Sequence, residues 1–104
     1  MIDLITQKRE EVAEHCRRLN VRRLEVFGSA ANGMFNPEKS DIDFVVEFGK
    51  GHEHLDLLDR YLDLAESLEA LFGRKVDLVT VGGVAKKPRF HANVEAEKEA
   101  VYAL

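Results

Sequence analysis

The chain has 104 residues, of which 45% are hydrophobic and 33% charged, with only two prolines and seven glycines. This composition predicts one folded domain with a single core, spanning residues 1–104, and excludes a disordered or fibrous chain. The formal net charge of −4 argues against binding of long nucleic acid, which needs a clustered basic surface, but is compatible with a small nucleotide held by metal ions.

The first half of the sequence predicts a helix followed by two strands. Apolar residues recur at helical spacing over residues 3–19, with the lone cysteine, Cys16, on the apolar face. Residues 22–27 form a short β-prone run, and the many turn formers of residues 28–40 exclude one long element there. Every second residue is apolar over 41–48, which predicts a strand with one buried face.

The second half predicts a long helix, a third strand and a last helix. An apolar helical stripe ends at Gly73, where a C-terminal cap belongs. Residues 75–81 alternate again until two glycines break the pattern, and Pro88 suits the first turn of a helix whose apolar face continues to Leu104. We therefore expect an α+β domain with a mixed sheet of at least three strands flanked by helices. The predicted stripe consists of Leu55, Leu58, Leu62, Ala65, Leu68 and Phe72.

Three acidic residues are candidate metal ligands. Asp41 and Asp43 lie two residues apart in one strand, so their side chains point to the same face. Such a pair repels itself, and Mg²⁺ removes the repulsion because it takes oxygen ligands and bridges carboxylates to substrate phosphates. Asp77 would add a third carboxylate if its strand lies beside the second. A solvated strand face is the alternative for the first two acids alone, and the third acid favours a metal site.

A phosphate-binding turn is expected at Gly28 and Ser29. A strand followed directly by these residues presents backbone N–H groups and a hydroxyl at the start of a turn or helix, an arrangement that binds phosphate oxygens. Gly-Ser is also a common turn pair, so it indicates phosphate binding only in combination with the acidic strand that follows it.

Two weaker groups stand outside this pattern. His52, Glu53 and His54 could bind a metal, but alternate residues at a helix entrance rarely converge on one ion, so we favour a solvated loop. Lys86 and Lys87, near Arg89, could contact a nucleotide or an acidic partner, although solvated surface charge is the more common role of such residues.

The combination of these motifs resembles the nucleotidyltransferase superfamily that includes DNA polymerase β. Within it, the chain is similar to the minimal nucleotidyltransferases (MNT), the small partners of HEPN toxins in prokaryotic toxin–antitoxin pairs. The resemblance covers nearly the whole chain and is most specific at residues 27–29, Phe-Gly-Ser, and 40–46, Ser-Asp-Ile-Asp-Phe-Val-Val.

The resemblance implies a role for each candidate residue. Gly28 and Ser29 would hold the nucleoside triphosphate. Asp41 and Asp43 would coordinate two Mg²⁺ ions, and Asp77 would complete one metal site and help to deprotonate the attacking hydroxyl. The implied reaction transfers AMP from ATP to a hydroxyl by in-line attack at the α-phosphate, with pyrophosphate leaving.

Two features depart from the family pattern. The turn often reads Gly-Ser-x-Ala-Arg-Gly, whereas here Asn32 stands in place of the basic residue. One residue more than is common in the family separates Ser29 from Asp41. Neither change removes an acidic ligand, so we expect an intact site.

The resemblance further implies the partner and the biological role. The acceptor would be a tyrosine of a HEPN-type toxin, which AMPylation would silence. The alternative is a non-catalytic antitoxin that neutralises its partner by binding alone, since an acidic surface would suit a basic RNase. Modification of a small molecule is a third hypothesis, but such relatives carry an additional domain to hold the acceptor.

The size of the domain bears on its partners and location. It leaves little room for an acceptor pocket, so we expect a protein partner to complete the site, and self-association into a homo-oligomer stays open. No run of about 20 apolar residues could span a bilayer, and no secretory leader pattern opens the chain, so we expect a cytoplasmic protein without membrane contact.

Overall fold

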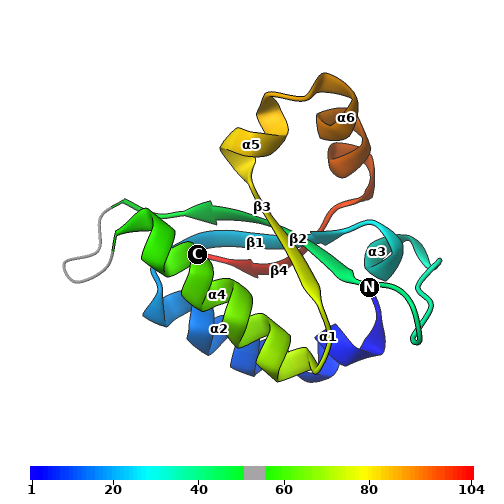
Figure 1. The fold of residues 1–104 in the computed structure, drawn as a ribbon, viewed down its shortest axis with the longest axis horizontal. Helices are drawn as coiled ribbons and strands as arrows, with labels where there is room; N and C mark the ends of the chain where they lie inside the picture. The colour runs from blue at the N-terminus through cyan, green and yellow to red at the C-terminus, as the bar shows by residue number, and fades with distance from the viewer. Residues whose placement is uncertain (51–55) are drawn as a thin grey trace.

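A computed structural model of the chain describes residues 1–50 and 56–104. It shows a four-stranded mixed sheet with helices on both faces (Figure 1), which confirms the predicted fold class. No helix in the described part combines the length and the apolar character that a membrane span needs. The elements are α1 (Asp3–Gln7), α2 (Arg9–Arg18), β1 (Val21–Phe27), α3 (Ser29–Asn32), β2 (Ile42–Phe48), α4 (Leu57–Phe72), β3 (Val76–Thr80), α5 (Val81–Ala85), α6 (Pro88–Glu97) and β4 (Glu99–Ala103).

The sheet has the strand order β3-β2-β1-β4. β1 pairs antiparallel with both β2 and β4, whereas β2 and β3 run parallel. Parallel neighbours need a crossover connection, and α4 provides it. The parallel register sets Asp43 opposite Asp77 and Phe44 opposite Leu78. The acidic residues of the two strands therefore lie side by side on one face.

The face that carries α2 and α4 holds the main core. Ile42, Phe44 and Val46 are buried there, as the alternation of β2 predicts. The ring of Phe44 stacks on that of Phe72 in α4, with 6.0 Å between their centroids. Cys16 is fully buried, and burial raises the pKa of its thiol to about 12, so it is a structural residue, as expected.

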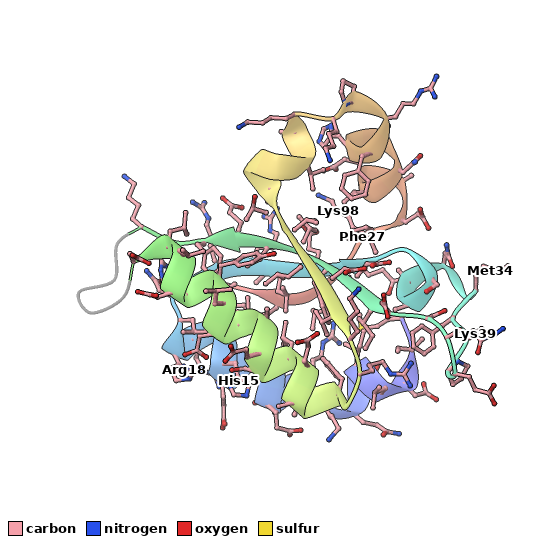
Figure 2. All side chains as sticks on the ribbon, viewed as in Figure 1. His15, Arg18, Phe27, Met34, Lys39 and Lys98 are labelled. Atoms are coloured by element: carbon pink, nitrogen blue, oxygen red, sulfur yellow. The ribbon has the colours of Figure 1, made fainter. Side chains whose placement is uncertain are left out.

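The opposite face is partly covered by α5 and α6, and it holds a smaller apolar cluster (Figure 1). Phe27 and Lys98 lie on this side of the sheet, toward α6 (Figure 2). Val45 is only 4% exposed because it packs in this cluster. The prediction of one buried face for β2 was therefore incomplete. The buried members of the cluster are Phe27, Val45, Val84 and Val94.

The C-terminal segment differs from the expected helix. The helix that begins at Pro88 ends at Glu97, and residues Glu99–Ala103 form β4 beside β1. Lys98 takes an extended conformation, φ −64° and ψ 143°, which ends the helix. Val101 matches helical spacing by coincidence. The segment Glu99–Ala103 is a strand because it pairs with β1, which lies far from it in the sequence.

Two shorter segments also depart from the prediction. The helix expected over residues 3–19 is divided in two at Lys8, where φ is −109° and ψ 18°. No glycine or proline marks the division, so periodicity could not locate it. The two glycines after β3 do end the strand, but they lie within α5, where the hydroxyl of Thr80 accepts a hydrogen bond from the N–H of Gly83 at 3.1 Å.

The apolar stripe predicted for α4 was partly wrong. Leu58 and Leu62 are 64% and 48% exposed, whereas Arg60 is only 5% exposed. Leu55, like the group from His52 to His54, lies outside the described residues. The side of α4 that faces the core is therefore rotated from the predicted one, toward Arg60, Leu64, Leu68 and Phe72.

Arg60 accounts for this rotation because part of its guanidinium is paired inside the fold, although its Nε has no hydrogen-bond partner in the described residues. Its guanidinium lies 5.0 Å from the ring centroid of Phe48. Its Nη1 donates to three backbone carbonyl groups at 3.3, 3.4 and 3.2 Å, those of Leu19, Asn20 and Gly49. Arg60 thus ties α4 to the ends of α2 and β2.

Replacing Arg60 should destabilise the fold. Arg60→Met removes the guanidinium donor from three carbonyl groups, of which only that of Asn20 keeps another donor in the described part of the chain, the N–H of Gly49 at 2.8 Å. We therefore expect a loss of about 2 to 4 kcal/mol in the free energy of unfolding, measured by equilibrium urea denaturation. Arg17→Met, at an exposed arginine of α2, is the control and should change stability by less than about 0.5 kcal/mol. Equal losses in both variants would contradict the role of Arg60.

Candidate active site

Gly28 connects β1 to α3 through a tight turn. Its φ of 68° and ψ of −150° form a conformation that only glycine adopts readily. Its carbonyl accepts from the N–H groups of Ala31 and Asn32, both at 3.0 Å. The first N–H groups of a helix have no intrahelical partner, and the Ser29 hydroxyl makes no hydrogen bond within the described part of the chain. The turn therefore offers free donors of the kind that bind an anion.

This turn packs directly against the acidic strand. Phe27 is the register partner of Asp43 in the antiparallel pair of β1 and β2. A Cβ atom at Gly28 would lie 2.5 Å from Oδ2 of Asp43, closer than real Cβ contacts allow. Glycine is thus required at position 28 both by the backbone conformation and by the neighbouring carboxylate. The predicted phosphate turn and one predicted metal ligand form one site.

Asp43 and Asp77 form a pair of adjacent carboxyl groups. The pKa of Asp43 is raised to about 6, first by burial and then by the charge of Asp77, a hydrogen bond between the two carboxyl groups and the charges of Asp41 and Glu97. Two acids forced together in this way hold a shared proton or need a cation between them. The pair therefore has the electrostatics of a cation site.

Asp41 stands apart from this pair. It precedes β2, and its Oδ2 lies 3.9 Å from Nζ of Lys75. In residues 1–50 and 56–104, no group of three or more histidine, cysteine or acidic side chains is placed to hold a metal ion. The two adjacent carboxyl groups of Asp43 and Asp77 nevertheless fit Mg²⁺, which commonly combines one or two protein carboxylates with substrate phosphates. The structure brings two of the three predicted ligands together, and metal binding by all three stays a prediction.

Sequence reasoning missed the aromatic walls of the site. Asp43 and Asp77 line a hollow of about 430 Å³. Phe27 and Phe90 meet edge to face beside them, with 5.6 Å between ring centroids. Tyr61 reaches the edge of β3 from α4 and donates its hydroxyl hydrogen to a backbone carbonyl there. These rings had no recognisable motif, because they come together only through the packing of α4 and α6 around β3. The other walls are formed by Val76, Leu78 and Val79.

Asn32, the departure from the family pattern, has a partner in α6. Its Nδ2 donates to Oε2 of Glu97 at 2.6 Å, and its Oδ1 accepts from the N–H of Met34 at 3.0 Å. Because Glu97 also contributes to the raised pKa of Asp43, the end of α6 lies near the acid pair. Asn32, which replaces the basic residue of the family pattern, therefore links α3 to α6.

Arg74 contacts the loop that joins the Gly28 turn to β2. It donates to the backbone carbonyls of Ser40 and Pro37 at 3.2 and 2.9 Å, and its guanidinium lies 4.9 Å from the ring centroid of Phe35. The longer connection between the turn and the acidic strand is therefore fixed to the segment just before β3.

Gly28 provides a test of the close packing in the site. Gly28→Ala should cost about 1 to 3 kcal/mol of stability and displace the Asp43 carboxylate, so that Mg²⁺ no longer raises the melting temperature. Gly33→Ala is the matched control, because Gly33 also has a positive φ, 86°, but an added Cβ meets nothing within 4 Å. A Mg²⁺ response that survives in Gly28→Ala would contradict the predicted site.

The raised pKa of Asp43 predicts a pH dependence of stability. Between about pH 4 and pH 6 the folded protein keeps a proton that the unfolded chain has lost, so the metal-free protein loses stability as the pH rises through this window. Asp43→Asn removes this loss, and the stability difference between variant and wild type should grow over the window and then level off. Thermal unfolding in EDTA at several pH values measures it, and a difference independent of pH would contradict the prediction.

Comparison with known proteins places the chain in a family. The sequence profile of the nucleotidyltransferase domain matches residues 9–103. Protein adenylyltransferase MntA from Thermococcus cleftensis is 40% identical over 76 residues, which cover 73% of this chain and 69% of that protein.

Solved structures with the same fold agree with this match. A minimal nucleotidyltransferase superposes with a TM-score of 0.72 and 36% identity, covering 93% of this chain and 92% of the other. A toxin–antitoxin with AMP-PNP superposes with a TM-score of 0.69 at 20% identity, covering 92% of this chain and 73% of the other. A complex of a tri-AMPylated Shewanella oneidensis HEPN toxin with MNT antitoxin superposes with a TM-score of 0.65 at 18% identity, covering 96% of this chain and 73% of the other. The last two share the fold, and the profile match over most of the length shows that this chain is a nucleotidyltransferase and belongs to the nucleotidyltransferase domain family.

Proposed function

We propose that this single-domain chain transfers AMP from ATP, with Mg²⁺, to a tyrosine hydroxyl of a HEPN-type partner and acts as its antitoxin. The main support is the pair of Asp43 and Asp77 beside the Gly28 turn, because it combines a cation site with free anion-binding donors. The relative MntA is named a protein adenylyltransferase, and a structure with this fold contains an AMPylated HEPN toxin.

Each site residue has a role in this proposal. The N–H groups after Gly28 and the Ser29 hydroxyl bind the β- and γ-phosphates of ATP. Asp43 and Asp77, with Asp41 as the third acid, hold two Mg²⁺ ions. When bound, these ions neutralise charge on the phosphates.

The transfer itself follows from this placement. The acceptor oxygen attacks the α-phosphorus, the bond from this phosphorus to the bridging oxygen breaks, and pyrophosphate leaves on the side of the Gly28 turn. The hydroxyl proton passes to Asp77, the outer acid of the pair in β3. The edge-to-face contact of Phe27 and Phe90 keeps an apolar wall beside the reacting groups.

Neutralisation by binding alone is the competing proposal. Leu57, Leu58 and Leu62 are 55%, 64% and 48% exposed on α4, and such a group of apolar side chains marks a surface for a partner. A partner bound there would be neutralised whether or not AMP is transferred. The two proposals therefore differ in what an active-site substitution does.

The test uses ATP radiolabelled at the α-phosphate, Mg²⁺ and lysate from the protein's own source. The wild type should label a discrete protein. Asp43→Ala should lower labelling by about 10²- to 10³-fold, because the substitution removes a ligand of the ions that stabilise the transition state. Glu47→Gln is the matched control, since Glu47 lies on the same face of β2, further along the strand, and it should label normally.

Two results separate the proposals. Label that depends on both Asp43 and Mg²⁺ supports the transferase. A lack of label, with a partner that co-purifies equally with wild type and Asp43→Ala, overturns it in favour of an antitoxin that acts by binding.

A further inference from the structure

The hollow beside the acid pair contains a hydroxyl group that the proposed reaction does not use. Of the described residues that line this hollow, only Tyr61 carries a hydroxyl. Asp43 and Asp77 line the same hollow. The chain therefore holds a tyrosine of its own at the place where AMP is proposed to pass to the tyrosine of a partner.

The position of this hydroxyl follows from the geometry of β3. The N–H of Ile42 donates to the carbonyl of Lys75 at 3.2 Å, so the carbonyl of Lys75 points toward β2. Peptide groups alternate in direction along a strand, so those of Asp77 also point toward β2, whereas those of Leu78 point outward. β3 is an edge strand, and the Tyr61 hydroxyl donates to the carbonyl of Leu78. The hydroxyl therefore lies at the outer edge of the sheet, beside the residue that follows Asp77.

This outer edge of β3 is the acceptor side of the proposed reaction. In phosphoryl transfer the attacking and leaving oxygens lie roughly in line on opposite sides of the phosphorus. Pyrophosphate leaves at the Gly28 turn, which follows β1, and the acids of β2 and β3 come next across the sheet. Tyr61 lies beyond these acids, at the end of the same order. The attacking hydroxyl thus approaches from the side on which Tyr61 lies.

Tyr61 is also held in place before any acceptor arrives. It belongs to α4, packs against the main core and is half-buried. Phe90 lines the same hollow from α6. An attacking group that belongs to the protein needs no separate binding step, so its effective concentration beside the acid pair is high.

We propose that the protein adenylylates itself on Tyr61. This inference rests on the proposed function, because it uses the same ATP site. The Tyr61 hydroxyl oxygen forms a bond to the α-phosphorus of ATP, and the bond from this phosphorus to the bridging oxygen breaks. Pyrophosphate leaves at the Gly28 turn, and the hydroxyl proton passes to Asp77. The product is AMP joined to Tyr61 by a phosphodiester.

The test incubates the purified protein, without lysate, with Mg²⁺ and ATP radiolabelled at the α-phosphate. Label should stay on the protein after denaturation in urea, and mass spectrometry of its peptides should place AMP on Tyr61. Tyr61→Phe lacks the attacking oxygen and should lose the label. Tyr102→Phe is the matched control and should be labelled like the wild type, because Tyr102 is the other tyrosine of the chain and lies in β4, at the opposite edge of the sheet. The mapped site decides the question even if Tyr61→Phe folds poorly.

A mixing experiment tests whether the hydroxyl reacts in the hollow of its own chain. Asp43→Ala, carrying an affinity tag, is mixed with untagged wild type under the same conditions. The variant keeps Tyr61 but lacks a proposed metal ligand, so it should stay unlabelled while the wild type is labelled. Equal label on the two proteins would contradict the placement of Tyr61 in its own active site.

Two further results would overturn the inference while leaving AMP transfer to a partner intact. The label on the purified protein could map to a residue other than Tyr61. The wild type could label a protein of the lysate but not itself. A protein that transfers AMP neither to itself nor to a lysate protein overturns this inference together with the proposed function.

Discussion

The parallel pairing of β2 and β3 imposes the constraint on which the site depends, because it sets Asp43 directly beside Asp77. Two acids in this position repel each other, and burial together with this repulsion raises the pKa of Asp43. The fold sustains the pair through contacts at the start of β3, where the carboxylate of Glu69 in α4 accepts a hydrogen bond from the N–H of Val76 at 3.1 Å. A proton or a cation relieves the repulsion, so the pair is most stable when it is protonated or when it binds a cation.

Features encoded by neighbouring residues could be predicted from the sequence. The alternation of β2, the end of α4 at Gly73 and the turn at Gly28 depend on local geometry, and all three are present. Features that depend on distant contacts could not be predicted in this way. The strand β4 exists because β1 offers it an edge, and Arg60 is buried because backbone carbonyls from two other segments surround it. The pairing of Asp41 with Lys75 likewise joins the residues just before β2 and β3, which only the fold brings together.

The link between Asn32 and Glu97 gives the departure at position 32 a structural meaning. An arginine there would carry a charge beside the phosphate turn, whereas the asparagine joins α3 to the last turn of α6 without one. The same helix supplies Phe90 to the hollow beside the acid pair. Helix α6 therefore contacts both the phosphate turn and the β3 side of the site, so a movement of α6 would change the two together.

An open site at the edge of a small sheet places demands on the acceptor. The site lies on the face covered only in part by α5 and α6, while the exposed leucines of α4 belong to the helix that packs on the other face. An enzyme of this size cannot enclose a protein acceptor, so in our proposal a partner surface positions the attacking hydroxyl.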